Sequence, residues 1–354
     1  MVDFTISLFS DTETRPTLRM REVMASAEVG DEQKNEDPTI NLLQERVAKF
    51  LGKEAALWFP SGTMCNLVAV KSHTRPGDAI IADWMAHIIR AESAGVALGS
   101  GVLVEPIQTE RGIFSPEALE VAIERVTTVA VPYGQPVGLV CVEQTHNFGG
   151  GAVWSLDELS AISSVARARR IPVHMDGARL VNACAATGVS ASEFGAQVDS
   201  LWIDFTKGLG APIGAVLAGT KDFLSVARRY KQLFGGSMRQ AGIAAAGCLY
   251  ALDHHVDRLV DDHDNARILA SGLAEIDGIH VRTRNPESNM VFFDVSGLDV
   301  NNDEFLLRLE KAHVRMSMTG KEVRAVTHLN VSRKDIETVI VAVRTIASGH
   351  DTCS

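Results

Sequence analysis

The segment SLWIDFTKGLGAPIGAVLAG, residues 200–219, decides the fold assignment. Residues 200–205 form an apolar run that predicts a buried strand, and residues 214–219 predict a second one. Glycines and a proline fill the turn between them, and Lys207 stands just after the first strand. A buried lysine loses the solvation of its charged form, which lowers the pKa of the amine and makes it nucleophilic. The segment therefore predicts a reactive lysine at the edge of a sheet.

Strand-like runs recur on the N-terminal side of this segment and alternate with helical patterns. Ser115 and Ser155 open two of these helical patterns as cap residues. Apolar strands that alternate with helices predict an α/β fold, in which a mostly parallel, seven-stranded sheet is covered on both faces. The predicted strands are residues 55–59, 78–83, 102–107, 139–145, 171–176, 200–205 and 214–219.

The pattern changes beyond about residue 240. A long helical pattern, broken at most once, covers residues 243–276, and a last helix begins at Ser332 with Asp335 in a capping arrangement. Strands at residues 289–295 and 323–331 flank a helix at 302–313. We therefore expect a large domain over residues 1–245 and a smaller α+β domain over residues 246–354.

The composition excludes several classes of function. The chain has 354 residues and a net charge of −10, which argues against nucleic acid or an anionic membrane as its partner. No apolar run reaches the ~20 residues of a membrane helix, and the N-terminus does not resemble a secretory signal. Five cysteines are spread along the chain without metal or redox spacing. We expect a cytoplasmic protein without a metal site.

Ligands of open α/β sheets bind beyond the carboxyl ends of the strands, and polar residues of this chain gather there. Ser61, Gly62 and Thr63 follow a strand and open a helix, where free backbone N–H groups suit a phosphate; an ordinary capped turn is the alternative. His146 follows another strand and precedes three glycines, so it is either a catalytic or a structural histidine.

Asp176 ends the strand that precedes the lysine strand, and Arg179 follows three residues later. One interpretation is that Asp176 and Arg179 form an ion pair that holds a turn. The other is that Asp176 is a buried carboxylate that faces a cationic ligand. A lysine amine forms imines with aldehydes, and pyridoxal 5′-phosphate is an aldehyde whose ring nitrogen pairs with a carboxylate. With that cofactor, Thr206 becomes a phosphate ligand and His87 an aromatic side chain that stacks on the ring. Alone, His87 would be a surface or core histidine.

Nine segments, taken together, resemble the L-threonine aldolase family of pyridoxal 5′-phosphate enzymes. The match runs in order over nearly the whole chain, and HMDGAR followed by KGLGAPIG is its most distinctive part. The segments are SDTETRP (10–16), NEDPTINLLQ (35–44), PSGTMCNLVA (60–69), AHIIRAESAG (86–95), VEQTHNFGGG (142–151), HMDGARLVNA (174–183), DFTKGLGAPIGAVLAG (204–219), GGSMRQAGIAAAGCLYAL (235–252) and VRAVTHLNVS (323–332).

The resemblance implies the aspartate aminotransferase fold (fold type I) and a homotetramer, a dimer of dimers with active sites at subunit interfaces. It also implies a role for each motif residue. The catalytic residues would be Lys207, which binds the cofactor covalently, Asp176, which pairs with its ring nitrogen, and His146 and His87, which handle the proton of the substrate hydroxyl. The cofactor would further contact Ser61, Gly62, Thr63, His87, Arg179, Thr206 and, from a neighbouring subunit, Arg239. The substrate carboxylate would contact Ser10, Arg179 and Arg324.

The implied reaction is cleavage of the Cα–Cβ bond of an L-3-hydroxy-α-amino acid, which yields glycine and an aldehyde. Residues 33–35 read QKN where family members commonly carry a tyrosine, and Ile88 and Ile89 replace a common NY pair. These departures leave L-threonine, L-allo-threonine and L-phenylserine open as substrates. A β-eliminating lyase, an aminotransferase and a catalytically silent binding protein on the same fold are the alternatives.

Overall fold

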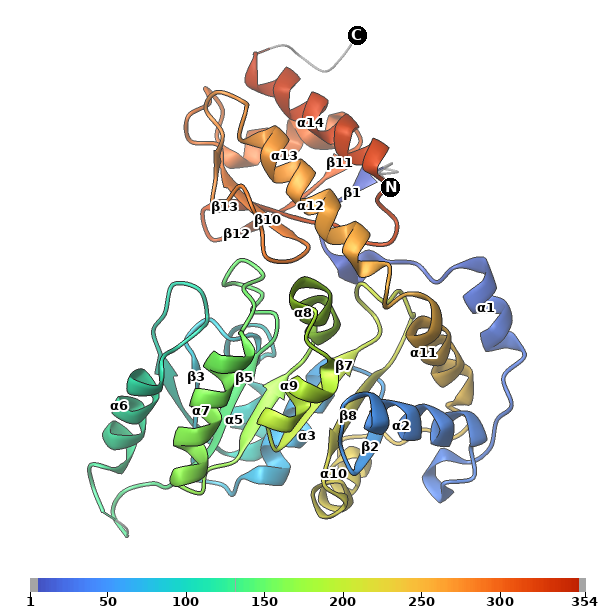
Figure 1. Ribbon diagram of the computed structural model, residues 1–354, viewed down its shortest axis with the longest axis vertical. Coiled ribbons are helices and arrows are strands. Elements are labelled where there is room, and N and C mark those ends of the chain that lie inside the picture. Colours follow the sequence, from blue (N-terminus) through green and yellow to red (C-terminus); the bar gives the residue numbers. More distant parts are fainter. Residues whose placement is uncertain (1–5, 131, 350–354) are drawn as a thin grey trace.

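The computed structural model describes residues 6–130 and 132–349. Its main feature is a seven-stranded sheet in the order β2-β8-β7-β6-β5-β3-β4 (Figure 1). β8 is antiparallel to both of its neighbours, and the other strands run parallel. The predicted α/β fold with a mostly parallel sheet is confirmed. The strands are β2 (Ala55–Phe59), β3 (Ala79–Asp83), β4 (Leu103–Ile107), β5 (Val137–Glu143), β6 (Val173–Asp176), β7 (Ser200–Asp204) and β8 (Ala215–Gly219).

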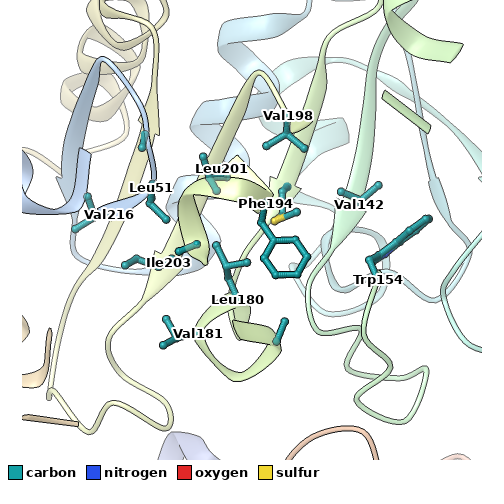
Figure 2. Packing of buried hydrophobic residues seen from close by; sticks show 14 of the residues in the cluster. Leu51, Val142, Trp154, Leu180, Val181, Phe194, Val198, Leu201, Ile203 and Val216 are labelled. Atoms are coloured by element: carbon teal, nitrogen blue, oxygen red, sulfur yellow. The ribbon is translucent and has the colours of Figure 1, made fainter. Parts of the chain in front are cut away.

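The central strands are mainly apolar because both of their faces are buried. In β7, Leu201 and Ile203 join the main hydrophobic cluster, whereas Trp202 points to the opposite face and joins a second cluster. Figure 2 shows Leu201 and Ile203 packed near Phe194 and Leu180 in the main cluster. Successive side chains of a strand point to opposite faces, so a strand between two helical layers carries apolar residues on both faces.

Helices cover both faces of the large sheet. The predicted serine caps are present, since Ser115 caps α6 and Ser155 forms a capping box at the start of α7. The main cluster contains residues of α2 (Pro38–Phe50), α6 (Pro116–Thr127), α7 (Leu156–Ala168), α8 (Leu180–Thr187), α9 (Ala191–Gln197) and α11 (Gly242–His254). The clusters on the opposite face contain residues of α3 (Gly62–His73), α4 (His87–Arg90), α5 (Gly95–Ser100) and α10 (Lys221–Leu233).

A second, four-stranded antiparallel sheet lies in the C-terminal part, at the top of Figure 1. The N-terminal strand β1 (Ile6–Ser7) pairs with β11 (Val314–Arg315), so the start of the chain packs with this part. The predicted boundary at residue 245 stays a prediction. The remaining elements are β9 (His280–Val281), β10 (Met290–Asp294), β12 (Ser317–Thr319), β13 (Glu322–Val326), α1 (Leu18–Ala25), α12 (Leu259–Leu273), α13 (Asn302–Lys311), α14 (Arg333–Ala347) and the short 3₁₀ helices Asp11–Glu13 and Glu32–Lys34.

The long helical pattern of the C-terminal part is interrupted once, between α11 and α12, in agreement with the expectation of at most one break. The strand expected over residues 323–331 ends at Val326. The helix at His87, α4, spans only His87–Arg90, and Ala91 is its C-cap. Cys353 lies outside the described residues. Within the described ranges, no helix is both long and apolar enough to cross a membrane.

Candidate active site

A cavity of about 450 Å³ opens at the carboxyl edge of the large sheet. It forms there because β6 and β7 end side by side, while the loop after β2 turns into α3 at the same edge. Thr12 and Thr14 from the N-terminal segment also line it. The structure brings seven of the predicted site residues to its wall: Ser61, Gly62, Thr63, His87, Asp176, Thr206 and Lys207.

Lys207 is largely buried and faces a carboxylate. Its Nζ lies 3.3 Å from Oδ2 of Asp204 and 5.9 Å from the centre of a Trp202 ring. Oδ1 of the same carboxylate accepts the N–H of Thr206 at 2.8 Å and its hydroxyl at 2.7 Å. Thr14 donates its hydroxyl to the carbonyl of Lys207 at 2.8 Å. The side chain of Lys207 therefore faces Asp204 while its backbone carbonyl is bound by Thr14, and the Thr206 hydroxyl donates its hydrogen bond to Asp204.

Asp176 is buried and has no ion pair with Arg179. Its Oδ1 accepts the N–H of Ala178 at 3.0 Å, and its Oδ2 accepts an amide hydrogen of Asn66 at 2.7 Å. Burial, together with the nearby carboxylates of Glu143 and Glu92, raises the pKa of Asp176 to about 6. The turn-holding ion pair considered above is therefore wrong, and the carboxylate is free to face the cavity.

The loop after β2 presents the N-terminus of α3 to the cavity. Ser61 caps the helix by accepting the N–H of Met64 at 3.4 Å. The amides of Gly62 and Thr63 lie in the first turn, where no intrahelical partner exists. A Cβ at Gly62 would lie 2.2 Å from the Trp202 ring, so only glycine fits under this turn. Such an end attracts anions.

His87 begins α4 and is about one-third exposed to the cavity. Its Nδ1 lies 2.8 Å from Oε1 of Glu92, and its backbone N–H donates to Glu143 at 2.7 Å. Burial alone would lower the pKa of His87, but the hydrogen bond to Glu92 and the carboxylate of Asp176 raise it. With Nδ1 occupied by Glu92, Nε2 is the ring nitrogen available for chemistry.

The two predicted carboxylate-binding arginines meet at one amide oxygen. Arg324 donates to Oδ1 of Asn147 at 3.1 Å, and Arg179 approaches the same atom at 3.5 Å. Arg179 also donates to both oxygens of Asp11, each at 2.7 Å. Ser10 is buried beside Asp11 and caps a 3₁₀ turn. Neither arginine lines the 450 Å³ cavity.

His146 lies outside the main cavity. Only 1% of its side chain is exposed, and it borders a separate cavity of about 220 Å³. Its Nδ1 accepts the N–H of Gly149 at 3.0 Å, and its Nε2 lies 3.1 Å from Asp83 at ion-pair distance, outside hydrogen-bond geometry. Burial would lower the pKa of His146, but Glu143 and Asp83 raise it. Both nitrogens therefore face protein atoms.

Arg239 also lies away from the main cavity. Its side chain is 59% exposed and lies 3.0 Å from Asp31. The neighbouring Glu32 forms an ion pair with the buried Lys231 and accepts the N–H of Met238 at 2.8 Å. This packing fixes the Arg239 loop on the surface of the protein. The QKN stretch, residues 33–35, lies in the same region.

Sequence reasoning missed the residues that hold the predicted ones in place. These are Asp11, Asn66, Glu92, Asn147 and Asp204, all of them buried. Asp11 follows Ser10 inside the family-like segment SDTETRP, and Asp204 lies three residues before Lys207, so each lies beside a residue that the sequence did predict. Asn66 lies inside α3 and Glu92 lies in the turn between α4 and α5, and nothing in the local sequence pattern distinguishes either residue.

The residues around the cavity fit pyridoxal 5′-phosphate. The lysine amine matches the aldehyde of the cofactor, and the buried carboxylate matches its ring nitrogen. The imidazole matches the face of the ring, and the helix N-terminus matches the phosphate. All four groups line the same cavity.

Comparison with known proteins agrees with the motifs. A family model described as beta-eliminating lyase matches residues 7–296. The chain is 36% identical over 341 residues to low-specificity L-threonine aldolase 1 of Arabidopsis thaliana, and the matched region covers 95% of this chain and 94% of that protein. It is 37% identical over 334 residues to low specificity L-threonine aldolase of Escherichia coli strain K12, and the matched region covers 94% of this chain and 97% of that protein.

Solved structures share the fold. A threonine aldolase from Leishmania major superposes with a TM-score of 0.82 at 20% identity, covering 97% of this chain and 99% of that one. An aspartate aminotransferase from Rhizobium meliloti superposes with a TM-score of 0.70 at 14% identity, covering 97% and 91%. At these identities the likeness shows the fold alone, and the predicted aspartate aminotransferase fold is confirmed.

Proposed function

Because the chain belongs to the beta-eliminating lyase family and, within it, to the L-threonine aldolases, we propose that it is a pyridoxal 5′-phosphate-dependent aldolase. It is a carbon–carbon lyase, and its proposed substrates are L-3-hydroxy-α-amino acids, which it cleaves to glycine and an aldehyde. The observation that carries the proposal is that Lys207, Asp176 and His87 line one cavity.

When bound, the cofactor supplies an aldehyde for the substrate amine and a ring that takes up the electron pair of the broken Cα–Cβ bond. Lys207 is the residue whose amine would hold that aldehyde in the absence of substrate. Asp176, kept ionised by two donors, pairs with the ring nitrogen. The first-turn amides of α3 and the hydroxyl of Thr63 hold the phosphate, and Thr206 lies beside them in the same wall.

Arg239 completes the phosphate site of a neighbouring subunit in this proposal. It is exposed and remote from its own cavity, but its loop is fixed by the buried Glu32–Lys231 pair, as a docking side chain requires. A homotetramer built from dimers would bring the loop to a partner's cavity. Exposed apolar side chains near this loop, Leu233 and Met238, support contact with another copy.

Arg324 and Arg179 bind the substrate carboxylate, together with Ser10. Their planar, permanently charged guanidinium groups suit a bidentate carboxylate better than a lysine would. Arg179 is oriented by Asp11 and keeps Nη1 directed towards Asn147, where Arg324 also points. Holding the carboxylate at this point orients the Cα–Cβ bond of the substrate relative to the ring.

The proton of the β-hydroxyl passes to Nε2 of His87 in this proposal. Cleavage of the Cα–Cβ bond then leaves the β-carbon as the carbonyl of the aldehyde, and a proton returned to Cα gives glycine. His87 is favoured over His146 because its Nε2 is free and its side chain lines the cavity. A histidine suits this step because the ordinary pKa of an imidazole, ~6.5, lies close to neutral pH.

The test is a substrate panel with the purified, cofactor-loaded protein. L-Threonine, L-allo-threonine and both L-phenylserine diastereomers are each assayed for glycine, aldehyde, ammonia and 2-keto acid. The proposal expects equal amounts of glycine and aldehyde from at least one of the four. Ammonia with a keto acid would instead identify a β-eliminating lyase, and transfer of the amino group to a keto acid would identify an aminotransferase. The panel also identifies the preferred side chain and the preferred configuration at the β-carbon.

A further inference from the structure

Asn66 lies on α3, is fully buried, and has no role in the proposed chemistry so far. Its side chain contacts four groups. Nδ2 donates to Oδ2 of Asp176 at 2.7 Å and to Oε1 of Glu92 at 2.8 Å. Oδ1 accepts from Nε1 of Trp202 at 2.7 Å and lies 3.3 Å from Nε2 of His174. A single amide of α3 thus contacts β6, β7 and the turn between α4 and α5 beneath the cavity.

The partners fix the orientation of this amide. An indole nitrogen only donates, so the atom that faces Trp202 must be the amide oxygen. The amide nitrogen then faces both carboxylates and gives one hydrogen to each. The flipped amide would place its oxygen against Asp176 and Glu92 and would leave three donors facing one another. Only the first arrangement satisfies every group.

The same reasoning fixes the protons of two histidines behind Asn66. His174 donates from Nε2, and burial together with His73 lowers its pKa to about 3, so its Nδ1 carries no proton. Ser200 then donates to Nδ1 of His174 at 2.8 Å and accepts from Nε2 of His73 at 2.7 Å. Every hydrogen in this row points towards Asn66, and the row itself is uncharged.

We propose that Asn66 is a positioning residue for the cofactor, acting through Asp176 and through Glu92 with His87. The inference rests on the proposed function, because it takes Asp176 as the partner of the ring nitrogen. Glu92 accepts the Nδ1 hydrogen of His87 at 2.8 Å and the Asn66 amide with the same oxygen. One amide therefore fixes the orientation of the Asp176 carboxylate, assigned to the ring nitrogen, and through Glu92 that of the His87 imidazole, assigned to the ring face.

The amide is needed because two acidic groups lie close together in a buried place. The ligand atoms of His87, Glu92 and Asp176 lie within 4.8 Å of one another. Two buried carboxylates at such a distance favour a shared proton, unless donors stabilise both charges. The two N–H groups of Asn66 provide that stabilisation. Without them Asp176 takes up a proton, and a neutral acid no longer pairs with a protonated ring nitrogen.

Two variants test the proposal. Asn66→Ala removes the donors, and Asn66→Asp replaces them with a third carboxylate of the same shape. We expect the dissociation constant of pyridoxal 5′-phosphate to rise about tenfold in Asn66→Ala and about 100-fold in Asn66→Asp, as expected for lost hydrogen bonds to a charged group. The bound cofactor should also lose the absorbance of its ring-protonated form. An analogue with CH in place of the ring nitrogen should lose less affinity in both variants than the natural cofactor, because only the pairing with Asp176 requires the nitrogen.

The matched control is Asn265→Asp. Asn265 is a buried asparagine on α12 that donates to the carbonyl of Val331 at 3.1 Å, away from the cavity. This variant should lose stability but keep the dissociation constant of wild type. If Asn66→Asp does not fold, Asn66→Ala decides alone.

Each outcome is decisive. An unchanged cofactor dissociation constant in the Asn66 variants, or an equal loss of affinity for the natural cofactor and the CH analogue, would overturn the positioning role and leave the proposed function standing. A wild-type protein that binds no cofactor at all would overturn both.

Discussion

Arg179 and Asp11 form a bidentate ion pair in the protein interior, with Nε and Nη2 each 2.7 Å from a carboxylate oxygen. Both side chains are buried. Burial would raise the pKa of Asp11, but the Arg179 guanidinium outweighs it and holds that pKa well below its usual range. The N-terminal segment is therefore tied to the helix that follows β6, next to the proposed substrate carboxylate site.

Asp11→Asn should destabilise the protein by about 3 kcal/mol, because it leaves the Arg179 charge buried without a counter-charge. Chemical denaturation measures this loss. The matched control is Asp253→Asn, which breaks an exposed ion pair with Arg46 and should cost less than about 1 kcal/mol. Equal losses in the two variants would contradict the structural importance of the buried pair.

Cofactor affinity should fall in acid. The pKa of Asp176 is raised to about 6 by burial and by Glu143 and Glu92. Above that pH the carboxylate is ionised and pairs with the ring nitrogen; below it the neutral acid does not. The dissociation constant of the cofactor should therefore rise by up to about tenfold per pH unit below pH 6. Titrations of the unloaded protein measure this, and an affinity that stays constant down to about pH 5 would rule out Asp176 as the pairing group.

The two histidines should behave differently on substitution. His87→Phe keeps an aromatic ring in the cavity but removes Nε2, so kcat should fall by about 100-fold or more while the cofactor still binds. His146→Phe removes the imidazole that lies against Asp83 and Glu143, so stability should fall. The folded fraction should keep kcat within about tenfold of wild type. Reversed effects on kcat would return the proton-accepting role to His146.

Mixing inactive variants tests the shared active site. Lys207→Ala and Arg239→Ala should each lower glycine release on their own, Lys207→Ala completely. If Arg239 acts on a neighbouring subunit, a mixed dimer contains one intact site, because the lysine of one subunit meets the arginine of the other. Refolding the two variants together should then restore activity that neither has alone. No restoration, with mixed oligomers shown by native mass spectrometry, would place Arg239 in its own subunit's site or outside any site.

The parts that sequence reasoning predicted are those with local signals. Apolar runs predicted the seven strands of the large sheet. The charged residues Lys207 and Asp176 lie at predicted strand ends, and they were assigned to one site because the carboxyl ends of parallel strands share one edge of the sheet. Helix starts were predicted by serine caps, as at Ser155.

The remaining features depend on contacts between distant segments. Asn66 meets Asp176 from 110 positions away, and Asp11 meets Arg179 from 168 positions away. Such pairs form only when α3 and the N-terminal segment pack against the sheet. The orientation of His146 away from the main cavity likewise depends on Asp83, at the end of another strand. The residue pattern within one segment therefore cannot predict these contacts.

The central claim is that the cofactor is bound covalently by Lys207, and one measurement tests it directly. The purified protein is loaded with pyridoxal 5′-phosphate and reduced with borohydride, and the modified residue is located by peptide mass spectrometry. Lys231 is an internal comparison, because it is also a buried lysine near aromatic rings but forms an ion pair with Glu32 away from the cavity. The account predicts modification of Lys207 alone and none in Lys207→Ala. Modification of Lys231 or another lysine, or a Lys207→Ala protein that still carries the reduced cofactor, would contradict it.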